Sequence, residues 1–190
     1  MIRHEHFQTG AMPPEIKVRD DAMLRTMEPE DAGRLMEIFE ADPAIQDRVI
    51  WTSGLTDEAL TSRMIAFRSR FTSMYSLTKD EKVAGYLGLW EDDEGYFDGI
   101  PHPGEYGFGY FIDPAERGKG LVTEAARVLM QAAEETFEVN NYAVYVEDNN
   151  PDSQAVLVRL GFKPDEGQAG LFKDPKTGVM ERRWEKAPGE

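Results

Sequence analysis

The sequence predicts a single mixed α/β domain, in which one layer of sheet carries helices on its faces. Three observations support this fold class. The 190 residues suit one domain with a substantial core. Hydrophobic residues make up 41% of the chain and charged residues 30%, which is a globular composition. Segments with helical spacing also alternate with strand-like runs, an order typical of sheets covered by helices.

The chain begins with a polar, proline-containing stretch. We therefore expect a flexible lead-in over residues 1–20 and the folded domain over residues 21–190. A short strand is predicted over Ala22–Met27. The next helix is predicted to begin at Glu28-Pro29-Glu30-Asp31, because an early proline and acidic residues suit the first turn.

The rest of the chain alternates between helices and strands. Helices are predicted from Asp57 to about Phe71, over Leu121–Phe137, where apolar residues fall on one face, and over Asp152–Leu160, which Gly161 closes. Strands are predicted over Met74–Thr78, Val83–Trp90, Tyr106–Ile112 and Tyr142–Val146, with a last pair after Phe162.

Composition excludes several functions. The chain has no cysteine, so disulfides, thiolate metal sites and acyl-cysteine intermediates are excluded. The net charge of -15 argues against a nucleic-acid partner and favours a cationic one, although acidity can also serve solubility alone. No apolar run is long enough for a membrane span, and no secretory signal precedes the domain, so we expect a cytoplasmic protein.

The clearest motif is the turn Asp113–Leu121, which joins a predicted strand to the strongest predicted helix. Gly118 and Gly120 let the backbone approach a ligand closely, and the helix start adds N–H donors at the positive end of its dipole. Arg117 and Lys119 add positive charge. The turn therefore predicts an anion site, with a turn that needs glycine only for its geometry as the alternative.

Other phosphate motifs fit this turn less well. A P-loop needs glycine at Asp113 and Ser or Thr at Gly120, and a dinucleotide fingerprint needs a third glycine at Thr123.

Two motifs together carry a family resemblance. The first is GEYGFGYFIDP leading into AERGKGLVTEA, and the second is Asn150-Pro151-Asp152-Ser153 running on to Gly161-Phe162. In this combination the chain resembles the GNAT superfamily of N-acetyltransferases, and most closely its RimJ/RimL type, over about Ala22 to Trp184. The resemblance implies a mostly antiparallel central sheet with helices on both faces and a splayed strand pair that admits CoA.

The resemblance also implies where the cosubstrate acetyl-CoA binds. Backbone N–H groups of Arg117, Gly118, Lys119, Gly120 and Leu121 would hold the pyrophosphate. Asn150 would contact the pantetheine arm and Ser153 would lie near the thioester sulfur. The strand ending in Phe111 and Ile112 would hydrogen-bond the pantetheine. No metal is expected; His4 and His6 have metal-like spacing, but no further ligands accompany them.

The catalytic groups depart from the family pattern. The tyrosine that protonates the leaving thiolate in many relatives would fall at Leu157, so that role is empty or moves to Ser153. The superfamily's Gln or Arg before the first motif glycine is Ala115 here. Glu105 is the only match to the family's base, with His102 in the preceding loop as a further base candidate.

The chemistry limits the acceptor. An amine must be neutral to attack the thioester in a ternary complex. At pH 7 a lysine-type amine is neutral in about one molecule in 2,500, whereas an α-amine is neutral in roughly 10 to 15%. The few base candidates therefore favour an α-amine, such as a peptide N-terminus, or another amine of low pKa. The acidic stretch Glu91-Asp92-Asp93-Glu94 with Asp98 would attract a cationic acceptor, which keeps a small cationic amine as the other possibility. The alternative is a non-catalytic acyl-CoA sensor. A monomer or a homodimer is expected.

Overall fold

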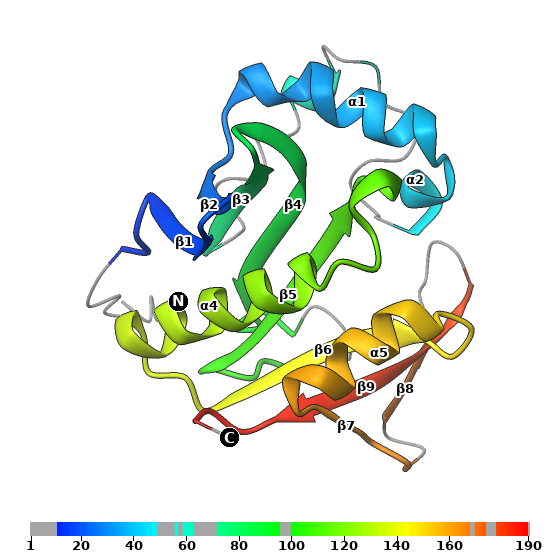
Figure 1. Cartoon of the computed structure of the whole chain (residues 1–190). Coiled ribbons are helices and arrows are strands. Elements are labelled where there is room, and N and C mark those ends of the chain that lie inside the picture. The colour runs from blue at the N-terminus through cyan, green and yellow to red at the C-terminus, as the bar shows by residue number, and fades with distance from the viewer. Residues whose placement is uncertain are drawn as a thin grey trace.

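The computed structural model describes residues 11–48, 56, 59–62, 72–95, 100–167, 170–173 and 178–189. Within this part of the chain, nine strands form one sheet in the order β1-β2-β3-β4-β5-β6-β9-β7, with β8 paired to β9 (Figure 1). The strands are Glu15–Arg19, Ala22–Thr26, Ser73–Lys79, Lys82–Glu91, Glu105–Ile112, Asn141–Glu147, Lys163–Pro164, Leu171–Lys173 and Met180–Lys186, numbered β1 to β9.

Four helices and two short 3-10 turns accompany the sheet in the described ranges. The helices are α1 Ala32–Ala41, α2 Ala44–Arg48, α4 Leu121–Thr136 and α5 Pro151–Leu160, and the 3-10 turns are η1 Pro29–Asp31 and η2 Pro114–Glu116. Residues 59–62 are helical as well. The remainder of the helix predicted over 57–71 lies outside the described residues.

The sheet separates two hydrophobic clusters, because successive side chains of a strand point to opposite faces. On one face Leu87 of β4 and Phe108 of β5 pack with apolar residues of α4 and α5. On the other face Tyr86 and Phe111 of the same strands pack with Phe39 of α1. The prediction of helices on both faces is confirmed.

A buried carboxylate fixes the start of α1. Asp31 is 5% exposed and accepts hydrogen bonds from Arg25 at 2.5 and 2.9 Å, from the Ser76 hydroxyl at 2.6 Å and from the Glu28 N–H at 3.0 Å. These bonds tie β2, β3 and the helix start together. Burial by itself would raise the pKa of Asp31, but the bonds from Arg25, Glu28 and Ser76 outweigh burial and lower it.

The β3–β4 hairpin closes through an unusual pair of residues. Lys79 pairs with Lys82, and the two residues between them, Asp80 and Glu81, have φ of 47° and 64°. Two positive φ angles define the type I′ turn, which suits the twist of a hairpin but favours Asn and Gly. The hairpin falls between the two strands that the sequence predicts over Met74–Thr78 and Val83–Trp90.

Two parts of the sequence prediction were wrong. The expected lead-in contains β1, which pairs antiparallel with β2 through residue pairs such as Ile16↔Leu24. Its side chains alternate between exposed and half-buried, and Ile16 and Val18 pack against the core. The short helix α2 was not predicted at all. The two-residue strand β7 was not predicted either, since only a pair of strands was expected after Phe162. The remaining described strands and helices stand within a few residues of their predicted positions.

The sheet opens between β5 and β6. These strands are parallel, unlike their neighbours, and pair only through Glu105↔Asn141 and Tyr106↔Tyr142. Beyond these pairs they diverge, as Figure 1 shows. The backbone of β5 from Gly107 onward therefore has no strand partner on this side and can hydrogen-bond a ligand in the gap. The predicted splayed strand pair is confirmed.

Candidate functional site

The turn between β5 and α4 has the geometry of an anion site. The Asp113 carboxylate accepts the Ala115 N–H at 2.8 Å and starts η2. Gly118 and Gly120 then have φ of 73° and 76°, the left-handed region that other residues adopt only with strain. Gly120 is the N-cap of α4. Among the described residues, the N–H groups of Gly118, Gly120 and Leu121 have no hydrogen-bond partner, so they remain available to a phosphate.

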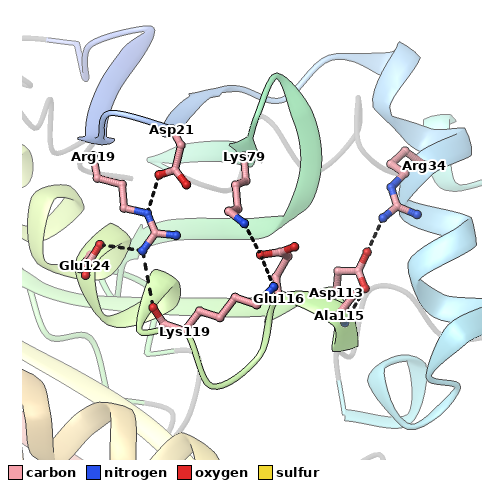
Figure 2. Close-up of polar contacts among 9 residues, drawn as sticks. All are labelled: Arg19, Asp21, Arg34, Lys79, Asp113, Ala115, Glu116, Lys119 and Glu124. Carbon is pink, nitrogen blue, oxygen red and sulfur yellow. Dashed lines mark hydrogen bonds and ion pairs between the residues drawn. The ribbon is translucent and has the colours of Figure 1, made fainter.

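Ion pairs fasten this turn to the sheet, as Figure 2 shows. Lys79 at the end of β3 lies 3.0 Å from the Glu116 carboxylate. Arg34 of α1 pairs with Asp113 and also donates to the Val83 carbonyl at 3.2 Å.

The start of α4 is held from the opposite side. The Arg19 guanidinium lies 2.7 Å from Asp21, 3.4 Å from Glu124 and 3.5 Å from the Lys119 carbonyl. The position of the turn is thus set by β1, β3 and α1 together, and none of these three contacts engages the free N–H groups.

The two cations predicted at the anion site are already ion-paired. Arg117 lies 2.5 Å from Asp42, which follows α1, and Lys119 lies 3.1 Å from Glu116. Hydrogen bonding by Lys79 and Lys119 lowers the pKa of Glu116, and hydrogen bonding by Arg117 lowers the pKa of Asp42. The backbone N–H groups are therefore the stronger part of this anion site, and the side chains of Arg117 and Lys119 can join it only by leaving their carboxylates.

The first turn of α5 faces the gap from the other strand. Asn150 is its N-cap, and the Asn150 side-chain oxygen accepts the Ser153 N–H at 3.2 Å. This leaves the amide nitrogen of Asn150 for a ligand. One turn later Leu157 is fully buried in the core. Leu157 is therefore a packing residue, and no hydroxyl replaces it at that position of the helix.

Glu105 lies at the closed end of the gap, in a nearly dry ion pair. Its carboxylate is 2.5 Å from Arg183 of β9 and accepts the Asn141 amide at 3.0 Å. The exposed fractions of the two charged side chains are 9% and 12%. Burial alone would lower the pKa of Arg183, but hydrogen bonds to Glu105, Glu185 and Tyr145 outweigh it and raise the pKa.

The structure brings the second base candidate close to the first. Ligand-type atoms of Asp92, His102 and Glu105 lie within 4.8 Å of one another. Beside them Trp90 covers the same face of β5, where a Cβ added to Gly107 would come within 2.7 Å of the indole. His4, His6 and Asp98 lie outside the described residues.

The cofactor strand contributes mainly backbone. The Phe111 side chain is 4% exposed and stacks on Tyr86 with ring centroids 5.4 Å apart. Ile112 pairs with Gly85 of β4. Asp113 donates its N–H to the Ala84 carbonyl of β4, so by the alternation of an antiparallel ladder the backbone groups of Phe111 face Tyr86 of β4 and those of Ile112 face the gap. Of the two residues predicted to contact the cosubstrate on this strand, only Ile112 therefore has backbone groups directed at the gap.

Sequence reasoning missed Tyr110. This residue of β5 lies on the face of the α4–α5 cluster, and its hydroxyl is buried without a hydrogen-bond partner in the described part of the chain. Its side chain contacts Ser153 without reaching hydrogen-bond geometry. The strand alternation predicts the face on which Tyr110 lies, but no sequence signal predicts that its hydroxyl lacks a partner.

A turn with free N–H groups at a helix start, beside an opening between parallel strands, suits a protein that seats a phosphorylated cosubstrate against a sheet edge. The family model of the acetyltransferase (GNAT) domain matches residues 21–163. YdaF of Bacillus subtilis (strain 168), provisionally named a ribosomal N-acetyltransferase, is 27% identical over an alignment 184 residues long, which covers 89% of this chain and 96% of YdaF.

Solved structures have the same fold. RimL without ligand, a ribosomal L7/L12 alpha-N-protein acetyltransferase, has a TM-score of 0.70 and 18% identity over 91% of this chain and 93% of RimL. The aminoglycoside acetyltransferase AAC(6')-Ib in complex with coenzyme A has a TM-score of 0.71 and 18% identity over 87% and 94% of the two chains.

The chain therefore belongs to the GNAT family of acetyltransferases, and it resembles the RimJ/RimL type. Its activity is acetyl-CoA-dependent acetyl transfer, which favours the enzyme over the non-catalytic sensor. The two solved relatives act on different acceptors, so the acceptor of this chain has to be argued from its site. Within the described residues, no helix is long and apolar enough to cross a bilayer.

Proposed function

We propose that this enzyme acetylates an α-amine, most simply the N-terminus of a protein or peptide, by direct attack on acetyl-CoA in a ternary complex. The observation that carries the proposal is the ion pair between Glu105 and Arg183 at the closed end of the gap. The Glu105 carboxylate already accepts hydrogen bonds from Arg183 and Asn141, so little of its accepting capacity is left for a proton from the substrate amine. Such a site suits an amine that needs little help to lose its proton.

The size of that help separates the acceptor classes. Deprotonating a lysine-type amine at pH 7 costs about 4.6 kcal/mol, whereas an α-amine with a pKa near 8 costs about 1.4 kcal/mol. The difference corresponds to a rate factor of more than a hundred. We propose that Glu105 receives the proton of the α-amine through water, with His102 close by as an alternative acceptor.

The two faces of the sheet divide the reaction. Glu105 points to the face that carries α1, because Tyr106 and Phe108 point to the α4–α5 face. Tyr110 and Ser153 lie on the α4–α5 side. We propose that the amine approaches from the α1 face and that the thiolate leaves toward the α4–α5 face, with the acetyl carbonyl in the gap between them.

The proposed donor site uses the residues that border the gap. The pyrophosphate would lie on the N–H groups of Gly118 to Leu121, and the pantetheine along the open edge of β5, where the backbone of Ile112 faces the gap. Asn150 would donate its amide to the pantetheine, and Ser153 would stand beside the sulfur.

A small cationic amine is the second candidate. It is favoured by the net charge of -15 and by a run of acidic residues, which begins with Glu91 at the end of β4 and continues through Asp92, Asp93 and Glu94. Of these, Asp92 lies next to Glu105 and His102. The cytoplasmic location, the lack of a nucleic-acid partner, and a monomeric or homodimeric state stay predictions.

The test compares two acceptor peptides of the same sequence. One has a free N-terminus and acetylated lysine, and the other an acetylated N-terminus and free lysine. We expect free-thiol release from acetyl-CoA to be much faster with the α-amine peptide at pH 7 and the preference to shrink as the pH rises toward 10. Faster acetylation of the lysine peptide at pH 7 would contradict the proposal, and turnover with polyamines alone would favour the second candidate.

A further inference from the structure

The Tyr110 hydroxyl is a polar group that the fold leaves unsatisfied. Its oxygen is buried, and its polar neighbour in the described ranges is the Ser153 side chain, which does not meet hydrogen-bond geometry. Buried polar groups nearly always have a partner, since an unsatisfied one costs folding free energy. Tyr75 of β3 shows the ordinary arrangement, because its buried hydroxyl donates to the Pro13 carbonyl at 2.6 Å.

The position of Tyr110 connects the two sides of the gap. It lies four residues beyond Tyr106, the last residue of β5 that pairs with β6. Its side chain nevertheless contacts Ser153, which lies in α5 just after β6. The hydroxyl therefore stands where the strands have separated, between the open edge of β5 and the first turn of α5.

The chemistry of acetyl transfer needs a donor at this place. As the amine nitrogen forms its bond to the acetyl carbon, the bond from that carbon to sulfur breaks and the electron pair goes to sulfur. A preorganised donor aimed at the atom where negative charge develops lowers the barrier. The nearest helix position one turn after Ser153 is Leu157, which offers no donor.

On the basis of the proposed function, we propose that the Tyr110 hydroxyl donates a hydrogen bond to the sulfur of acetyl-CoA and stabilises the departing thiolate, with Ser153 beside it. Tyr110 is then a catalytic residue, because it touches the reacting atoms.

The hydroxyl acts as a hydrogen-bond donor that keeps its proton. Burial raises the pKa of Tyr110 to about 12, with a smaller opposing effect of Ser153. That is above the pKa of about 8.5 of an ordinary thiol, so the proton rests on the phenol when the thiolate has formed. The proton that balances the reaction comes from the amine, which loses it through water toward Glu105.

The test uses Tyr110→Phe, with Tyr75→Phe as the matched control. Both changes remove one buried hydroxyl, and burial raises the pKa of Tyr75 to about 12 as well. For Tyr110→Phe we expect kcat to fall at least about tenfold, the KM for acetyl-CoA to change little, and the Tm to stay or rise, since no hydrogen bond is lost. For Tyr75→Phe we expect a lower Tm and an unchanged kcat.

Calorimetry with CoA and desulfo-CoA, which lacks the sulfur, separates a role at the sulfur from a structural one. The native enzyme should bind CoA about fivefold more tightly than desulfo-CoA, and Tyr110→Phe should bind both equally. Native turnover and an unchanged preference in Tyr110→Phe would overturn this inference and leave the proposed function standing. No binding of either compound to the native enzyme would overturn both.

Discussion

Asp31 illustrates how one buried carboxylate can join three segments. Its oxygens accept bonds from Arg25 of β2, Ser76 of β3 and the Glu28 N–H ahead of α1. A network of this kind stabilises only while every member is charged or bonded as the fold requires, because an unpaired buried group carries its full desolvation cost.

Asp31→Asn should therefore lower the free energy of unfolding by about 2 kcal/mol at pH 7, the order of a charged hydrogen bond. The pKa of Asp31 is lowered in the folded protein. Its stabilising effect is thus complete above the unfolded value of about 3.9 and is lost as the pH falls through the lower folded value. Urea unfolding at pH 7 and pH 3 measures the difference, which should shrink in acid. The exposed neighbour Glu30→Gln is the control. An equal difference at both pH values would contradict this account.

The site residues show what a sequence can and cannot predict. The glycines of the turn and the Asn150 cap follow from local backbone chemistry, so their places were predictable. The partner of Glu105 was not, because Arg183 lies 78 positions away in the chain and meets it only through the sheet. Ser153 was predicted near the sulfur, but its neighbour Tyr110 depends on the distance between β5 and α5, which no local pattern encodes.

Turns in which residues other than glycine adopt positive φ angles reduce stability, and a substitution can recover part of that loss. In the β3–β4 hairpin, Asp80 and Glu81 adopt the left-handed region without being glycine. The conformation costs an ordinary residue about 1–2 kcal/mol, whereas glycine adopts it freely but loses about 0.5–1 kcal/mol through its flexible unfolded state.

Glu81→Gly should therefore stabilise the protein by roughly 0.5–1 kcal/mol and raise the Tm by about 1–3 °C. Thermal unfolding measures the effect. Glu81→Ala removes the same exposed side chain but keeps the Cβ, so it should bring no gain. Equal stabilisation by both variants would mean that the side chain of Glu81, and not its φ, limits the turn.

The missed elements have a physical reason. β1 consists mostly of charged residues, and its Ile16 and Val18 gain burial only when the strand lies on β2. α2 spans five residues, too short for a helical period to be visible. By contrast, α4 was predictable because its nine buried residues fall on one face over 16 positions.

The net charge of the chain acts on the two substrates in opposite directions. A net charge of -15 attracts a cationic acceptor and repels the phosphates of acetyl-CoA. The proposed anion site would therefore bind phosphates against the field of the whole chain, through the local N–H groups at the start of α4.

Raising the salt concentration should separate these effects. Between about 50 and 500 mM NaCl, kcat/KM for a lysine-rich acceptor peptide should fall several-fold, because screening shortens the reach of the acidic surface. For a peptide without other charges it should change little. The Kd of CoA, measured by calorimetry, should rise by a smaller factor than the KM of the lysine-rich acceptor peptide. The same salt dependence for both peptides would contradict electrostatic guidance.

The gap in the sheet has a mechanical consequence. Strands β1–β5 and strands β6–β9 form the two halves of the sheet. Within the sheet, these halves are joined at one end of the gap, by two β5–β6 residue pairs and the Glu105–Arg183 ion pair. A small rotation of one half against the other about this joined end would displace the open end of the gap, near the turn between β5 and α4, further than the joined end. A long cosubstrate that lies in the gap would contact both halves of the sheet and restrict their relative motion. We therefore expect the unloaded enzyme to be the looser one, and the departure of CoA to restore the freedom that admits the next donor.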